Sequence, residues 1–158
     1  MVKKVVAFGE IMLRLSTPGK QRFVQAESFD AIYGGGEANV AVSLANYGLN
    51  SCFVTKVPDN PIGQSAINHL RRFGVKTDYI IRGGNRLGIY FLESGSAQRA
   101  SAVVYDRSGA SIAEAIPADF NWRDIFSGAD WFHFTGITPA LSDHATAVTL
   151  DAVKTARE

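Results

Sequence analysis

Short apolar segments alternate with helical patterns along most of the chain, and this alternation limits the fold more than any other feature. The apolar, strand-forming segments lie at residues 4–8, 51–57, 77–81 and 130–134. Continuous apolar runs of this length are typical of strands that are buried on both faces of a sheet. Because parallel strands are usually joined by a crossover helix, the order predicts an α/β fold around a parallel sheet.

Three helices are predicted between or after these strands. The clearest follows Asn60, a good helix cap, and Pro61, which suits the first helical turn, and it ends at Gly74. The second covers about 36–47, and the third opens at Ser142. Apolar residues at helical spacing predict the buried faces. They are Ile62, Ala66, Leu70 and Phe73 in the first helix, and Ala145, Val148, Ala152 and Ala156 in the third.

Two further segments break this rhythm. Residues 87–93 and 102–107 are strand-like and are joined by the polar stretch 94–101, which predicts an antiparallel pair. Residues 12–16 and 22–24 are candidates to extend that pair. The pattern therefore predicts a second, smaller sheet that projects from the first as a lid or a dimer surface.

Charge and composition exclude several classes of protein. Sixteen lysines and arginines against fifteen aspartates and glutamates give a net charge of +1, so no charge excess points to a nucleic-acid or membrane partner. The lone Cys52 can form neither an internal disulfide nor a cysteine-based metal site, which suits a reducing compartment. The apolar run 5–8 is too short for a signal peptide or a membrane span. We expect a cytoplasmic protein that recognises a small molecule locally.

Three glycines at residues 34–36 stand at the start of the second predicted helix. Glycines allow a close backbone approach, and the first amides of a helix can face a ligand oxygen. A tight turn without a ligand explains the triplet equally well. A dinucleotide-binding fingerprint does not fit, because Asn39 stands where its last small residue belongs, and no phosphate-binding loop with its lysine occurs. Asn39 can bond sugar hydroxyls, or it can cap a turn.

Alternation along the two lid-like strands groups side chains that are suited to an acidic ligand. An arginine binds both oxygens of a carboxylate through its planar donors, and a tyrosine adds a hydroxyl and an apolar ring. Ordinary cross-strand packing with a solvated arginine is the alternative. The groups that share one face are Val103, Tyr105 and Arg107 on the second strand, and Tyr90 and Leu92 on the first.

Other ionisable residues give weaker signals. Glu10 directly follows the first strand, where open α/β sheets bind ligands, although an exposed carboxylate at a strand end is equally expected. His133 lies in an aromatic strand segment and is predicted to be a core or strand-end residue, whereas His69 and His144 are predicted on helix surfaces. These histidines do not have the spacing of metal ligands, and we predict no metal-binding residue in this chain.

Several of these motifs occur together in one known family. They are Gly9-Glu10 after the first strand, residues 34–41 with Gly48 following, and residues 130–136. In these positions the whole chain resembles the N-terminal half of PfkB (ribokinase-like) carbohydrate kinases. Within that family, residues 9–15, 105–108 and 113–115 resemble the 2-keto-3-deoxygluconate kinases most.

The resemblance implies a ribokinase-like, three-layer α/β/α domain with a small β-sheet lid, truncated within one domain. Lid strands around 12–33 and 87–107 would be inserted in the α/β core. The family resemblance further implies transfer of the ATP γ-phosphoryl group to a sugar hydroxyl with Mg²⁺, and a homodimer formed through the lid.

The resemblance also implies roles for individual residues. Carried over by position, Gly34, Gly35 and Asn39 would contact the sugar. Tyr90 would close over it, and Tyr105 and Arg107 would hold the carboxylate of an acid. Glu10 and Ile137 are two further substrate-binding candidates. The six main residues are Gly34, Gly35, Asn39, Tyr90, Tyr105 and Arg107.

The sequence departs from the family pattern in three places. Glu37 stands where a small residue is usual, as it does in ketodeoxygluconate-type members, and Arg14 stands where ribokinases carry an aspartate. An added cation at residue 14 suits an acidic sugar better than ribose. The catalytic aspartate of the family lies in a Gly-Ala-Gly-Asp motif, and residues 128–130 are one glycine short of it and run into a strand. We therefore expect half a kinase without a catalytic residue.

Three classes of function remain open on these grounds. The leading hypothesis is the sugar-binding half of an ATP-dependent 2-keto-3-deoxygluconate kinase. A fructokinase or another PfkB sugar kinase is the alternative among enzymes. A non-catalytic module for sugar-acid binding or dimerisation is a different class of function. A nucleotide-binding regulatory domain is disfavoured, because the phosphate loop is missing.

Overall fold

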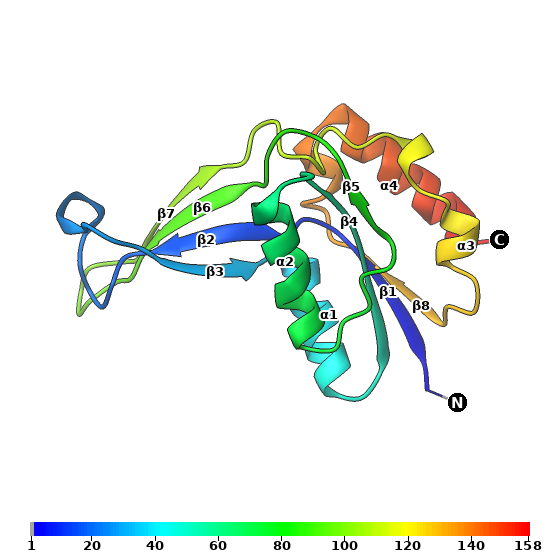
Figure 1. Cartoon of the computed structure of the whole chain (residues 1–158), viewed down its shortest axis with the longest axis horizontal. Coiled ribbons are helices and arrows are strands. Elements are labelled where there is room, and N and C mark those ends of the chain that lie inside the picture. The colour runs from blue at the N-terminus through cyan, green and yellow to red at the C-terminus, as the bar shows by residue number, and fades with distance from the viewer. Residues whose placement is uncertain (1) are drawn as a thin grey trace.

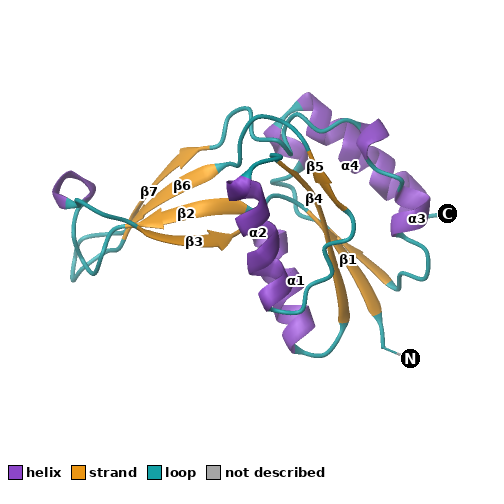
Figure 2. Cartoon of the chain, in the orientation of Figure 1, coloured by secondary structure: helices purple, strands orange, loops and turns teal. Residues whose placement is uncertain are grey.

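Within residues 2–158, the strands form two separate four-stranded sheets (Figures 1 and 2). The computed structural model describes residues 2–158. One sheet has the order β5-β4-β1-β8, and all its strands are parallel. Its strands are β1 (Lys4–Phe8), β4 (Asn50–Val57), β5 (Ile80–Arg82) and β8 (Trp131–His133). The predicted α/β fold around a parallel sheet is confirmed.

Helices cover both faces of the parallel sheet, as Figure 1 shows. On one face lie α1 (Gly36–Asn46) and α2 (Pro61–Arg72), and on the other lie α3 (Trp122–Ile125) and α4 (Asp143–Ala156). Successive side chains of β1 enter the two cores, since Phe8 packs in the cluster of Val148, whereas Ala7 packs in the cluster of Ala41. This alternation produces three layers. Among residues 2–158, no helix is long and apolar enough to span a membrane.

The helix starts follow the predicted capping residues. The Asn60 side chain accepts a hydrogen bond from the Gly63 amide at 2.9 Å, and the Ser142 hydroxyl accepts one from the Ala145 amide at 3.0 Å. Gly48 follows the end of α1 with φ +82°, a conformation that glycine adopts without strain. The predicted extents of α1 and α2 and the predicted start of α4 are therefore confirmed to within one or two residues.

The predicted buried face of α2 is partly wrong. Ile62 is 47% exposed and Phe73 is 36% exposed, whereas Gly63 and Ile67 are buried beside Ala66. The reason is the close approach of Gly63 to the carbonyl oxygen of Pro58, which a Cβ at Gly63 would overlap. This contact turns the glycine side of the helix toward the sheet, and Ile62 points away from it.

Two strand predictions are also corrected. β5 begins only at Ile80, because Thr77 closes a turn in which its carbonyl accepts a hydrogen bond from the Ile80 amide at 3.1 Å. Residues 22–24 form no strand, because the Gln25 amide bonds the Arg22 carbonyl at 2.9 Å and begins the short 3₁₀ helix η1 (Phe23–Gln25). The other short helices are η2 (Pro117–Asp119) and η3 (Pro139–Leu141).

The second sheet projects away from the three layers and is called the lid below (Figures 1 and 2). Its strands are β2 (Met12–Ser16), β3 (Asp30–Gly34), β6 (Ile89–Glu93) and β7 (Ala102–Asp106), in the order β3-β2-β6-β7. The central pair β2 and β6 is parallel, and the outer pairs are antiparallel. The predicted pairing of β6 with β7 and the strand at 12–16 are confirmed, whereas β3 was not predicted as a separate strand.

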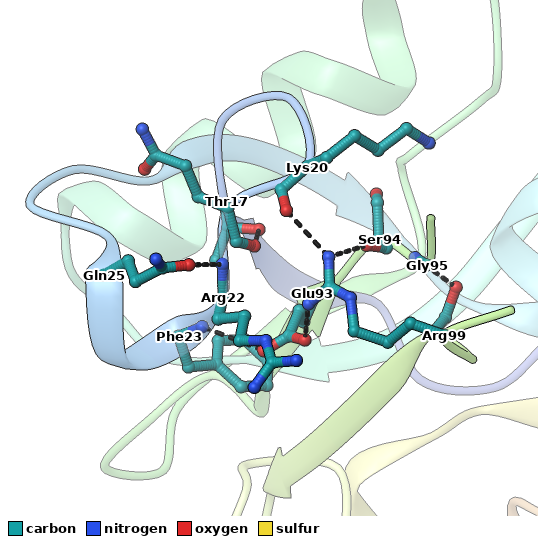
Figure 3. A network of polar contacts seen from close by, with 11 residues as sticks. Thr17, Lys20, Arg22, Phe23, Gln25, Glu93, Ser94, Gly95 and Arg99 are labelled. Atoms are coloured by element: carbon teal, nitrogen blue, oxygen red, sulfur yellow. Dashed lines mark hydrogen bonds and ion pairs between the residues drawn. The ribbon is translucent and has the colours of Figure 1, made fainter. Parts of the chain in front are cut away.

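A polar network holds the tip of the lid together (Figure 3). The Glu93 carboxylate accepts a hydrogen bond from the Phe23 amide at 2.9 Å and forms an ion pair with Arg99. The Arg99 guanidinium also donates to the carbonyl oxygens of Lys20 at 2.7 Å and Ser94 at 3.2 Å. Charge-assisted bonds of this kind are stronger than neutral ones. They link the loop after β2 to the β6–β7 hairpin, so the two halves of the lid are fastened at their far end.

The parallel sheet has a free edge at β8. Within residues 2–158, β8 pairs only with β1. The Trp131 side chain on this strand is 67% exposed and lines an open apolar groove. Val5, Val40, Leu44 and Leu49 form the rest of its apolar wall. Unpaired strand edges and apolar patches of this kind favour association with another chain or segment.

Candidate functional site

A cavity of about 220 Å³ lies where the root of the lid meets the parallel sheet. The loop after β1, the start of α1, the lid strands β2, β6 and β7 and the loop after β8 contribute to its wall. The carboxyl ends of parallel strands are the usual ligand-binding edge of open α/β sheets. The lining residues are Glu10, Met12, Gly35, Gly36, Glu37, Asn39, Tyr90, Val103, Tyr105, Arg107 and Ile137.

The glycine triplet forms the wall at the start of α1. A Cβ at Gly35 would overlap the carbonyl oxygen of Glu10, whereas a Cβ at Gly36 would meet no atom within 4 Å. Gly35 therefore allows the helix start to approach the loop after β1, and Gly36 leaves space beside the cavity. The backbone amide of Asn39 donates a hydrogen bond to the Gly35 carbonyl oxygen at 2.8 Å, which fixes the backbone of Asn39 in the first turn of the helix. The first amides of α1 thus stand beside the cavity, as the ligand-facing interpretation requires.

Two tyrosines of the lid form the opposite wall. Tyr90 and Tyr105 are paired directly across β6 and β7, and their ring centroids are 5.8 Å apart. A Cβ at Gly34 would lie 3.6 Å from the Tyr90 hydroxyl and 3.7 Å from the Asn39 side-chain oxygen. Gly34 itself does not line the cavity. The prediction that Val103, Tyr105 and Arg107 share one face is confirmed, since all three line the cavity, whereas Leu92 does not.

Arg107 is paired with a carboxylate of the chain itself. Its guanidinium Nη2 donates to the Glu10 Oε2 atom, and its guanidinium carbon lies 5.6 Å from the Tyr105 ring centroid. Glu10 is only 4% exposed and lines the cavity, so of the two interpretations left open for it, the exposed carboxylate at a strand end is wrong. Burial raises the pKa of Glu10 above its ordinary value, Arg107 opposes this shift, and the charge of Glu37 adds to it.

Glu37 holds the far wall of the cavity, a role that the sequence did not reveal. It is 3% exposed, and its Oε1 atom accepts bonds from the Thr135 amide (3.2 Å), the Thr135 hydroxyl (2.6 Å) and the Thr138 hydroxyl (3.1 Å). A Cβ at Gly9 would overlap the same carboxylate. These contacts fix the loop after β8 and with it Ile137. The only signal in the sequence was the unusual glutamate at a position where the family has a small residue.

The remaining candidates lie outside the cavity. His133 on β8 is half-buried beside the apolar groove, His144 is exposed, and His69 is half-buried against the rings of Tyr33 and Phe73. The predicted surface position of His69 is therefore only partly right, because these rings cover part of its side chain. Burial and the neighbouring Arg72 lower the pKa of His69. Across residues 2–158, the structure contains no group of three or more acidic, histidine or cysteine side chains that could hold a metal ion.

Asp130 lies at the opposite end of the sheet from the cavity. Its carboxylate pairs with the Lys3 ammonium at 2.5 Å and accepts a hydrogen bond from the Lys4 amide at 2.8 Å. Lys4 begins β1, and Glu10 follows the other end of that strand. The Gly128-Ala129-Asp130 segment therefore fastens the strand start and contributes nothing to the cavity.

Comparisons with known proteins agree with this arrangement. A 2-dehydro-3-deoxygalactonokinase of Haloferax volcanii is 37% identical over the whole chain, which covers 49% of that protein. A 2-dehydro-3-deoxygluconokinase of Thermoproteus tenax is 32% identical over 89% of the chain and 44% of that protein. The crystal structure of the 2-dehydro-3-deoxygluconokinase of Thermotoga maritima superposes with a TM-score of 0.97 at 59% identity over 98% of this chain and 48% of that one.

The chain spans about half the length of these relatives. The fold of the matched half is the same, including the lid. The sequence profile of the pfkB family of carbohydrate kinases matches residues 2–158. The chain therefore belongs to the pfkB carbohydrate kinase family.

Proposed function

We propose that this chain is the sugar-binding half of an ATP-dependent kinase for 2-keto-3-deoxygluconate or a closely related sugar acid. The observation that carries the proposal is the guanidinium of Arg107 in a small cavity between two tyrosines and a glycine-rich helix start. A cation in such a place suits a carboxylate, and hydroxyl and amide groups around it suit the remaining oxygens of a sugar. The matched relatives that are named for deoxy sugar acids support the same substrate class.

Each wall of the cavity has a proposed role in holding the sugar. The amides at the start of α1 and the side chain of Asn39 bond the hydroxyls, together with the backbone at Gly34 and Gly35. Tyr90 closes over the sugar ring or chain, and Tyr105 and Arg107 hold the carboxylate. Glu10 and Ile137 complete the wall. Phosphoryl transfer depends on the placement of the acceptor hydroxyl and the exclusion of water, which this half would provide.

ATP and Mg²⁺ are implied by the family, but residues 2–158 offer no set of ligands for a metal ion. The chain also has no phosphate-binding loop with its lysine. The residues described here therefore act on the sugar, and the nucleotide and metal are expected to be held by residues outside this half. The lone Cys52 is buried and free, which supports the proposed cytoplasmic location.

The test uses a completed chain, which we define as residues 1–158 joined to the C-terminal half of the Thermotoga maritima relative. Because the matched half is 59% identical to that relative, we expect the two halves to pack against each other much as they do in the relative. We expect the completed chain to phosphorylate 2-keto-3-deoxygluconate with a kcat/KM at least about tenfold above that for fructose, because only the acid uses Arg107. Equal activity on both sugars would instead favour a fructokinase-type specificity. Tight acid binding without turnover would favour the non-catalytic module.

We further propose that the lid mediates a homodimer. β7 is an edge strand of the lid, every residue of it is exposed, and Val103, Val104 and Tyr105 are 45–59% exposed. An exposed apolar edge strand is a template for pairing with another chain. Replacing Val104 with lysine is expected to raise the dimer dissociation constant of the completed chain by about tenfold or more, as measured by sedimentation. Leu150→Lys, at an exposed position on α4, is the matched control. Equal effects of the two variants would remove the lid from the interface.

A further inference from the structure

The ion pair at the root of the lid is only half formed. Arg107 gives one bond to Glu10, but the Oε1 atom of Glu10 and the Nε atom of Arg107 are buried without a hydrogen-bond partner in residues 2–158. A buried donor or acceptor that is left unpaired is destabilising, and more so when it is charged. Both atoms belong to side chains that line the cavity. The free site therefore holds a carboxylate that is poorly compensated.

The surrounding backbone keeps this carboxylate in place. A Cβ at Gly88 would overlap the side-chain Oε1 atom of Glu10, and a Cβ at Gly35 would overlap the backbone carbonyl oxygen of Glu10. The two glycines thus allow the chain to close around Glu10. Glu10 is 4% exposed and cannot turn its charge into water without a rearrangement of the lid root. Its state of charge is therefore governed by the groups that face it.

Few charged groups face Glu10. Arg107, which follows β7, pairs with it directly, and Glu37 at the start of α1 acts on it as a second negative charge. Tyr90 and Tyr105 line the same cavity from β6 and β7, and Met12 of β2 contributes an apolar side chain. Arg14 of β2 pairs in register with Tyr90 and so lies on the same face of the lid, but it does not line the cavity. Among the lining residues, Arg107 therefore carries the positive charge that offsets the two buried carboxylates before any ligand arrives. Burial and Glu37 raise the pKa of Glu10, and the Arg107 charge lowers it.

A sugar acid adds a third carboxylate to this cluster. We propose that Glu10 takes up a proton from solvent when the carboxylate of the substrate engages Arg107. The proton binds at the unpaired Oε1 atom, and no bond of the substrate changes. The inference rests on the proposed function, because it requires an acid that pairs with Arg107. The cause is electrostatic: the guanidinium turns its remaining donors to the ligand, and an ionised Glu10 would stand buried between two like charges.

Proton uptake would give the site a specificity that packing alone does not provide. A neutral ketose leaves the Arg107–Glu10 pair intact and needs no proton. An acid binds together with a proton, so its affinity depends on pH by linkage. As the pH rises from the pKa of Glu10 in the free site to its higher pKa in the complex, the affinity falls by up to about tenfold per pH unit. Below that window the affinity is independent of pH. Glu10 is thus a positioning residue that sets the charge of the site.

The experiment is calorimetric titration of the completed chain with 2-keto-3-deoxygluconate, in buffers of different ionisation enthalpy, from about pH 5.5 to 8.5. The slope of the measured enthalpy against the buffer enthalpy gives the number of protons bound. We expect uptake that approaches one proton per acid within the window, and none with fructose. Glu10→Gln is expected to bind the acid without uptake and with an affinity that does not depend on pH. Glu27→Gln, an exposed glutamate of the lid, should behave as the parent does.

The outcomes separate this inference from the proposed function. Acid binding without proton uptake at any pH overturns the inference alone, as does unchanged uptake in Glu10→Gln. Failure to bind the acid overturns both. If Glu10→Gln does not fold, as judged by circular dichroism, the parent chain still decides the question, because an acid affinity that is constant across the pH range excludes coupled protonation.

Discussion

Replacing Arg107 with alanine in the completed chain is expected to lower kcat/KM for 2-keto-3-deoxygluconate by about 30- to 1000-fold, or ~2–4 kcal/mol. The variant removes a charge-assisted and bidentate partner and leaves the substrate carboxylate partly desolvated. Fructose should lose far less, since it carries no carboxylate. Arg107→Lys should restore only part of the activity, because a point charge cannot provide two parallel donors. Steady-state kinetics with both sugars measure the difference.

The pairing with Glu10 requires a further control for this variant. Arg107→Ala leaves a buried, unpaired carboxylate, which costs stability whether or not the arginine touches the substrate. The double variant Arg107→Ala, Glu10→Gln removes that charge and should recover stability without recovering acid turnover. Arg72→Ala, at an exposed arginine of α2, controls for the general loss of positive charge. Equal losses on both sugars would mean that Arg107 supports only the lid.

The 158-residue chain alone is expected to show no ATP-dependent phosphorylation of any sugar acid, whereas the completed chain is active. The expectation rests on the family resemblance, which places the base for the acceptor hydroxyl in a Gly-Ala-Gly-Asp motif that these 158 residues do not contain. The chain alone is also expected to associate, or to unfold without a single cooperative transition, because β8 and its apolar groove are uncovered. A coupled kinase assay, sedimentation and thermal unfolding measure these properties.

Matched preparations make this result decisive. The C-terminal half of the Thermotoga maritima relative, expressed alone, should also be inactive, and mixing the two halves should restore part of the activity. Turnover by the purified 158-residue chain would contradict the prediction about chemistry. A monomer that unfolds cooperatively at an ordinary mesophilic midpoint would contradict the prediction about the free edge.

The elements of the fold that depend on local pattern could be predicted from the sequence. Cap residues such as Asn60 and Ser142 fixed the helix starts, and alternation placed Tyr105 and Arg107 on one face of the lid. Features that depend on distant contacts could not. The buried face of α2 was predicted incorrectly because Gly63 approaches the carbonyl oxygen of Pro58. The strand predicted at residues 22–24 is replaced by a turn that one local backbone bond closes.

The charged part of the site was the least predictable. Glu10 and Arg107 are 97 residues apart, and Glu37 and Thr135 are 98 residues apart. No periodicity connects such positions, and an ionisable residue at a strand end is by default expected in water. The burial of both glutamates depends on glycines whose missing side chains make room for them. The sequence therefore indicated many of the residues that line the cavity, but not how their charges compensate one another.

The two tryptophans of the chain provide optical probes of two different events. Trp122 is 3% exposed and stacks on the rings of Phe120 and Phe126 in the core beneath α4, whereas Trp131 is 67% exposed on the free edge of β8. Indole fluorescence responds to the polarity around the ring, since the ring is largely apolar but carries a polar N–H group. The emission of Trp122 therefore follows the integrity of one core. The emission of Trp131 follows the covering of the sheet edge, and the assembly of the two halves can be observed without an added label.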